Sequence, residues 1–148
     1  MTTTGTKRRA AIEKRQRAVT LVTGGTGFLG AHLVRQLTEE GAKDVRVMAT
    51  SIPDWLVDLG VETFAGSITN ADDNKRAVEG ISEIYHLAGK VSREREDARE
   101  MYDIHVEGTR LLCDAAKAAG VKTIVLASTS GTIAVTKDGE VIPDETYP

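Results

Sequence analysis

Closely spaced glycines are the residues in this sequence with the clearest chemical use. Gly24, Gly25 and Gly27 directly follow an apolar run at 19–22, and residues 25–30 read G-x-G-x-x-G. Glycine has no Cβ, so it tolerates positive φ and lets the backbone approach a ligand closely. A helix expected from about 27 to 40 directs its free N–H groups and positive dipole end at this turn. These features together predict a site for a phosphate anion.

The surroundings of the glycines favour one kind of anion, because the same pattern between a strand and a helix is the dinucleotide-binding fingerprint. The apolar run at 19–22 predicts a buried strand. Leu29, Leu33 and Leu37 recur at every fourth position, which predicts an amphipathic helix, and Gly41 is suited to end it. The alternative interpretation is a glycine-rich turn that only joins a strand to a helix.

Strand and helix signals alternate along the rest of the chain. Further strands are expected at 44–49, 61–65, 84–88 and 123–127, and further helices at 53–59, 71–79 and 93–119. Thr69 or Asn70 is the expected N-cap of the 71–79 helix, and Asp138-Gly139 suggests a hairpin turn. This alternation predicts an α/β fold with a parallel sheet.

Composition favours one globular domain, at 18–148, after a basic leader at 1–17. The chain has 148 residues, 41% of them hydrophobic and 28% charged, and no apolar run approaches the roughly 20 residues that span a bilayer. The single cysteine, Cys113, excludes an internal disulfide and fits a reducing cytoplasm. We interpret it as a small core residue of a helix.

The leader at 1–17 carries six lysines or arginines against one glutamate, although the whole chain has a net charge of −3. It has no apolar segment typical of a secretory signal. A nucleic-acid or membrane arm is one interpretation; a disordered, solubilising leader is the favoured one, since no aromatic residue lies among the basic ones. We therefore expect no nucleic-acid partner, no membrane partner and no metal site.

The end of the expected second strand bears on the form of a dinucleotide. A carboxylate there binds the ribose 2′-hydroxyl, whereas an arginine nearby accommodates a 2′-phosphate. The strand ends Ala49-Thr50-Ser51, with neither, and both hydroxyls suit either ribose; Asp54 lies just beyond. The choice between NAD and NADP stays open, with a slight preference for NADP because the carboxylate is missing.

Several motifs in order resemble one family. These are Thr23–Gly30, Tyr85–Gly89, Val106–Thr109 and Ser128–Ser130, with Asp144–Pro148 at the end. Together they resemble the extended short-chain dehydrogenase/reductases, the group of NAD-dependent epimerase/dehydratases and dihydroflavonol-reductase-like enzymes, over about residues 18–148. The resemblance implies a Rossmann-type, doubly wound parallel sheet with strand order 3-2-1-4-5, five strands out of about seven, incomplete on the C-terminal side.

The resemblance also assigns roles to residues. Gly24, Gly27 and Gly30 would hold the pyrophosphate, while Phe28 and Leu29 supply N–H groups to it. The implied cofactor-binding set is completed by Thr50, Ser67, Ile68, Leu87, Ala88 and Gly89. Ser130 would hold the substrate oxygen, with Ser128 as its competitor; the other interpretation of both serines is a polar cap where the strand ends.

The sequence departs from the family pattern at three points. Ser67 stands where an aspartate often binds adenine, and His105 where an asparagine is common; His105 is either a proton relay or a histidine satisfied by a neighbour. No Tyr-x-x-x-Lys pair, the family's proton donor and its activator, occurs in these residues. We therefore expect the chain alone to lack hydride chemistry.

The predicted function is the NAD(P)-binding portion of an oxidoreductase or epimerase acting on a hydroxyl or carbonyl compound, such as a nucleotide sugar or small ketone. The alternative is a non-catalytic dinucleotide-binding module. A homodimer is expected to pair through the 93–119 helix. Because the fifth strand would form an open apolar edge, the chain alone is expected to be poorly stable or to associate.

Overall fold

The structure, a computed structural model, describes residues 19–42, 44–129 and 144, so the leader and the Asp138-Gly139 hairpin lie outside the described part. The described residues form five strands: β1 (Thr20–Thr23), β2 (Val45–Ala49), β3 (Glu62–Ala65), β4 (Glu83–His86) and β5 (Thr123–Leu126). The α-helices are α2 (Phe28–Glu39), α3 (Asp54–Asp58), α4 (Ala71–Ala77), α5 (Ala98–Tyr102) and α6 (Thr109–Ala119). A 3₁₀ turn, η1 (Arg95–Asp97), precedes α5, and a π-helical turn, η2 (Asp103–Gly108), joins α5 to α6.

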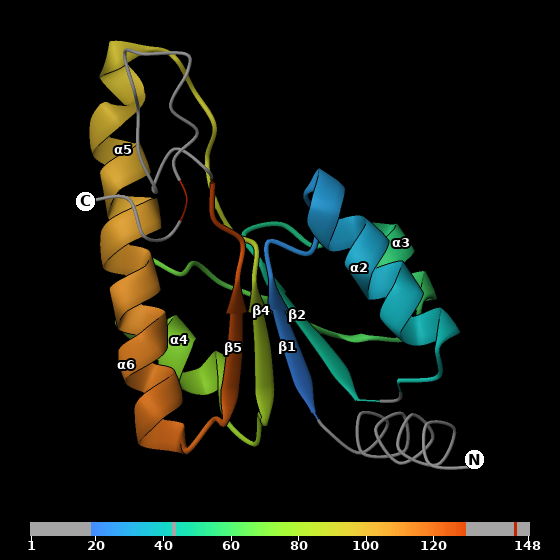
Figure 1. Cartoon of the computed structure of the whole chain (residues 1–148). Helices are drawn as coiled ribbons and strands as arrows, with labels where there is room; N and C mark the ends of the chain where they lie inside the picture. The colour runs from blue at the N-terminus through green and yellow to red at the C-terminus, as the bar shows by residue number, and fades with distance from the viewer. Residues whose placement is uncertain (1–18, 43, 130–143, 145–148) are drawn as a thin grey trace.

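The strands form one parallel sheet in the order β3-β2-β1-β4-β5, which confirms the predicted Rossmann-type order. In the register, Thr20 lies beside Val45 on one side and Glu83 on the other. Helices cover both faces of this sheet, with α2 and α3 on one side and α4, α5 and α6 on the other (Figure 1). All strands therefore present their carboxyl ends, and the loops that follow them, at one edge.

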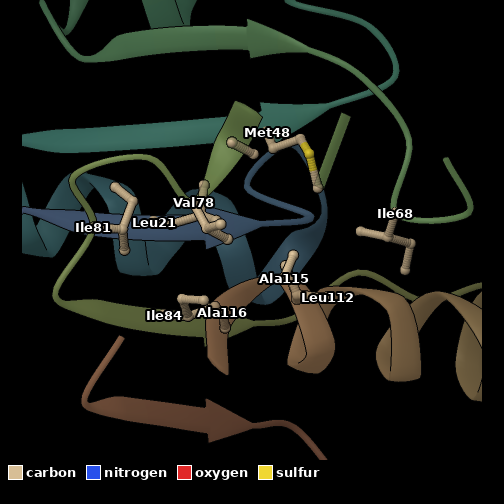
Figure 2. Close-up of a cluster of buried hydrophobic side chains, with 10 residues drawn as sticks. Leu21, Met48, Ile68, Val78, Ile81, Ile84, Leu112, Ala115 and Ala116 are labelled. Carbon is tan, nitrogen blue, oxygen red and sulfur yellow. The ribbon is translucent and has the colours of Figure 1, made fainter. Parts of the chain in front are cut away.

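The alternation of strand side chains divides the core in two, because successive residues point to opposite faces. Leu21 and Met48 face one layer and pack with helical residues such as Leu112, as Figure 2 shows. Their neighbours Val22 and Val47 face the other layer and pack with α2. The apolar runs of the sequence are thus buried on both faces, as parallel strands require.

Two expected elements differ in detail. The predicted 93–119 helix is continuous only from Arg95, and η2 interrupts its α-helical bonding. The predicted N-cap of α4 is Asn70, whose side chain accepts hydrogen bonds from the N–H groups of Asp72 and Asp73, while Thr69 lies outside the cap. The side chains of Ile124, Val125 and Leu126 in β5 are 38–53% exposed, so β5 is an open edge of the described sheet.

One arginine ties the opposite, amino-terminal edge of the sheet together. The Arg46 guanidinium donates to the carbonyl oxygens of Ala77 and Glu79 at 2.8 and 3.0 Å, and its Nε lies 2.9 Å from Glu62 Oε1. These contacts join β2 to the end of α4 and to β3.

In the described residues no helix is long and apolar enough to cross a bilayer.

Candidate functional site

A cleft of about 360 Å³ lies where the carboxyl ends of the strands meet. It is bordered by the glycine turn after β1, by the loops after β2, β3 and β4, and by α5 and η2. The cleft brings together eight of the predicted cofactor-binding residues: Gly24, Gly27, Thr50, Ser67, Ile68, Leu87, Ala88 and Gly89. Ligands of open α/β sheets bind at this edge, between strands whose connections diverge to opposite faces.

Gly24 and Gly30 have different structural roles in and beside the turn. Gly24 has φ +71°, and a Cβ there would lie 2.6 Å from the backbone nitrogen of Ala88, so only glycine fits. Gly30 is buried in α2, and a Cβ would press on Gly24 and come within 2.8 Å of Gly25 Cα. Gly30 therefore packs the helix against the turn and is not among the residues that line the cleft, while its role at the pyrophosphate stays a prediction.

The N-terminus of α2 begins at the glycine turn. Gly27 is the N-cap and its residue type provides no side-chain cap, while the first turn contains no acidic residue. The first α-helical bond runs from Ala31 N–H to the Gly27 carbonyl, so the N–H groups of Phe28 and Leu29 precede it. Their side chains are 87% and 59% exposed and do not line the cleft, so these two residues offer backbone only.

The loop after β3 is held by residues that sequence reasoning missed. The Ser67 N–H donates to the Asp73 carboxylate at 3.0 Å, and the Asn74 amide donates to the Ile68 carbonyl at 2.6 Å. The Ser67 N–H, followed by the Arg76 side chain, lowers the pKa of Asp73. The usable signal was their position in the first turn of the predicted 71–79 helix, directly after the loop. This anchoring fixes the shape of the cleft at Ser67 and Ile68.

The opposite wall of the cleft is built from Lys90 and the α5–η2 segment. The Lys90 ammonium bonds Asp97 at 2.8 Å and Glu100 at 2.5 Å, and these bonds, Asp97 first, raise the pKa of Lys90. The His105 ring lies against Gly89, with Nε2 2.8 Å from the Lys90 carbonyl oxygen. The interpretation of His105 as a histidine satisfied by a neighbour is confirmed.

A second histidine, His86, lies fully inside the molecule just beneath the cleft. Its Nδ1 is 2.6 Å from the Thr23 hydroxyl and its Nε2 is 2.9 Å from the Thr109 hydroxyl. Burial first, and then the nearby His105, lower the pKa of His86 to about 4. The imidazole is therefore neutral at pH 7. Its position at a buried end of an expected strand was the only sequence signal.

Ser130, the expected substrate-binding residue, lies outside the described residues. Its competitor Ser128 is described and exposed, two residues beyond β5 at the same edge as the cleft. Groups of three or more histidine, cysteine or acidic side chains arranged to hold a metal ion are absent from the part of the chain that the structure describes.

Comparison with known proteins identifies the class. The NAD dependent epimerase/dehydratase family matches residues 20–148, and the chain belongs to this family. Its fold is therefore that of a family of NAD-dependent proteins.

Individual relatives agree with this assignment. The chain is 39% identical to Sterol demethylase protein B of Methylococcus capsulatus over 122 residues, covering 81% of this chain and 37% of that protein. It is 38% identical over 128 residues to a putative dihydroflavonol 4-reductase of Synechocystis, covering 85% and 36%. The UDP-glucose 4-epimerase of Thermus thermophilus, solved in complex with NAD, superposes with a TM-score of 0.72 at 29% identity, covering 87% and 43%. The chain thus spans little more than a third of the curated relatives' length.

Proposed function

We propose that this chain is the NAD(P)-binding portion of an oxidoreductase or epimerase that acts on a hydroxyl or carbonyl substrate, such as a nucleotide sugar or a small ketone. The observation that carries this proposal is the cleft at the carboxyl edge of the sheet, which Gly24 and Gly27 line beside the N-terminus of α2. A bound nicotinamide cofactor supplies the hydride chemistry, and the protein supplies its position. The Thermus thermophilus relative was solved in complex with NAD, which supports NAD binding by this chain.

Each end of the cleft suits one half of a dinucleotide. The N–H groups of Phe28 and Leu29 suit the pyrophosphate, because a helix N-terminus attracts anions. Thr50, at the end of β2, lies toward the adenosine half, since the ribose of this half binds there in dinucleotide folds. Leu87 and Gly89, on the far side of the glycine turn, are left for the nicotinamide half.

The charges around the cleft bear on the proposed form of the cofactor. The missing carboxylate after β2 favours NADP, but an adjoining pocket of about 450 Å³ beside Thr50 and Ser67 is also lined by Glu100, Asp103 and Glu107. No lysine or arginine is among the described residues that line this pocket, although each carboxylate has a cationic partner outside it. A 2′-phosphate needs a cation, so geometry favours NAD over the NADP that the sequence alone suggested.

The substrate role of Ser130 remains part of this proposal. In the sequence it comes four positions after the last residue of β5, and β5 ends at the edge of the sheet where the cleft lies. A hydroxyl there suits a hydrogen bond to a substrate oxygen that alternates between hydroxyl and carbonyl.

Gly27→Asp tests the dinucleotide site without disturbing the fold. A Cβ at Gly27 meets only the Gly24 carbonyl oxygen, at 3.3 Å, and aspartate is among the best N-cap residues. The new carboxylate satisfies the N–H groups of α2 and repels a pyrophosphate. We expect calorimetric titration to find NAD⁺ binding by the chain, weaker NADP⁺ binding, and loss of both in Gly27→Asp with an unchanged or higher melting temperature.

Gly27→Ala is the matched control, since it adds the same Cβ without charge. It should weaken binding by less than about tenfold, because one methyl group forces only a small shift. Retention of NAD⁺ binding by Gly27→Asp, or absence of binding by the folded parent chain, would overturn the proposed function. Tighter binding of NADP⁺ than of NAD⁺ would overturn only the preference for NAD.

A further inference from the structure

The buried His86 connects three segments that border the cleft. It bonds Thr23, the residue directly before Gly24, and Thr109, the residue directly after η2. The exposed fraction of the His86 side chain is 2% and that of Thr23 is 0%. A buried polar pair of this kind is stable only when each group is hydrogen-bonded, and here each group has its partner.

On the Thr23 side, hydrogen bonds join the end of β1 to the loop after β4. The Thr23 hydroxyl also accepts the Ala88 N–H at 3.4 Å, and the Thr23 carbonyl accepts the Leu87 N–H at 3.1 Å. One residue further on, the backbones of Gly24 and Ala88 are in direct contact. The relative position of the two loops therefore depends on where the Thr23 hydroxyl is held.

The Thr109 side reaches the other wall. Thr109 follows Gly108, and a Cβ at Gly108 would lie 2.9 Å from the side chain of Ile68, which lines the cleft. This contact is apolar and is made by the side chain of Ile68 rather than by backbone. It fixes the helix against the loop after β3 less strictly than the backbone contact on the Thr23 side fixes the two loops.

We propose that His86 is a positioning residue for the dinucleotide: by holding the Thr23 hydroxyl, it sets the relative position of the glycine turn and the loop after β4. This inference rests on the proposed function, since it concerns the same cleft. It goes beyond it in assigning a role in cofactor affinity to a side chain that does not line the cleft.

Two substitutions separate the two ring nitrogens. In His86→Asn the amide reaches the position of Nδ1 and keeps a partner for Thr23, whereas in His86→Gln it reaches the position of Nε2 and keeps a partner for Thr109. A role in stability alone predicts that affinity for NAD⁺ changes little, or in step with the melting temperature. The positioning role predicts that the two variants differ in affinity even where their melting temperatures are similar.

We expect His86→Asn to bind NAD⁺ within about threefold of the parent chain and His86→Gln about tenfold more weakly, the loss of one hydrogen bond. Thr23→Val and Thr109→Val repeat the comparison with the imidazole intact, should a His86 variant fail to fold. Thr23→Val should weaken NAD⁺ binding like His86→Gln, and Thr109→Val like His86→Asn. Thr38→Val, whose hydroxyl bonds only carbonyls of its own helix among the contacts described, is the control for replacing a threonine.

Equal affinity of the Thr23→Val and Thr109→Val variants, or affinities that follow melting temperature across all five variants, would overturn the positioning role. Failure of the folded parent chain to bind NAD⁺ or NADP⁺ would instead remove the proposed function, and with it the basis for the inference. Binding by the parent chain therefore decides the first question, and the asymmetry between the paired variants decides the second.

Discussion

At the scale of single residues, His86 links stability to pH. Its pKa is lowered to about 4 in the folded chain, from an ordinary value near 6.5, by burial and by His105. The unfolded chain therefore binds a proton between these values that the folded chain does not. The contribution of His86 to stability is complete above pH 6.5 and declines as the pH falls toward 4, by about 2 kcal/mol between pH 6.5 and 5.

Urea unfolding of the parent chain and of His86→Asn at pH 7.5, 6.5 and 5 measures this directly. All other residues are the same in the two proteins, so the difference between them isolates His86. The free energy of unfolding should fall more steeply with acid in the parent chain. Parallel curves would contradict the assignment.

Residues whose role depends on local backbone geometry were easier to predict from the sequence than residues whose role depends on a partner far away in the chain. Gly24 and Gly27 could be identified because turn geometry is local, and they line the cleft. His86 could not be, because its partner Thr23 is 63 residues away in sequence. Gly30 was predicted to hold the pyrophosphate, and in the structure it packs against Gly24. A pattern of glycines does not show which glycine faces a ligand and which one packs against other backbone.

At the scale of elements, the start of α4 depends on one side chain. Asn70 Oδ1 accepts the N–H groups of Asp72 and Asp73 at 2.9 and 3.2 Å. Asn70→Ala should lower the free energy of unfolding by about 1 kcal/mol, because those donors lose their acceptor. Chemical denaturation monitored by circular dichroism measures the change.

Asn70→Ser is the control, since its hydroxyl can cap the same N–H groups. It should keep most of the stability. A loss as large as that of Asn70→Ala would mean that the packing of Asn70, rather than its cap, stabilises this end of the helix.

Helix η2 is the element that the sequence pattern described least well. The sequence predicted one uninterrupted helix at 93–119, and the helical course is correct from Arg95 onward. A π-turn adds a residue to one turn, and side-chain patterns tolerate this because both flanking segments keep their own faces. The interruption places His105 against Gly89, at the wall of the cleft.

At the scale of the whole molecule, the strand order was predictable because the resemblance to the dehydrogenase/reductase family implies it. The distribution of exposure along β5 follows from that order. Ile124, Val125 and Leu126 are apolar and exposed. Their strand is an edge of the described sheet, so no other described strand pairs with its outer side. We therefore predict that the chain associates through β5.

Val125→Lys should reduce this association, since a charge on an edge strand opposes pairing. Sedimentation velocity over a range of protein concentrations measures it. Val91→Lys is the matched control, because Val91 is 98% exposed but lies in a loop. Association that survives Val125→Lys would point instead to the 93–119 helix, where Tyr102 and Val106 are exposed, as the homodimer surface.

The ties of Arg46 at the amino edge of the sheet have a consequence for how this chain can change. Arg46, Glu62 and the carbonyl of Ala77 form an anchor on the side opposite the cleft. Effects of substitutions at well-separated sites add. Substitutions around Arg46, whether they arise in evolution or are introduced to raise thermal stability, can therefore leave the shape of the loops at the cleft unchanged. In the same way, substitutions in the cleft can change its specificity without lowering the stability that the Arg46 contacts provide.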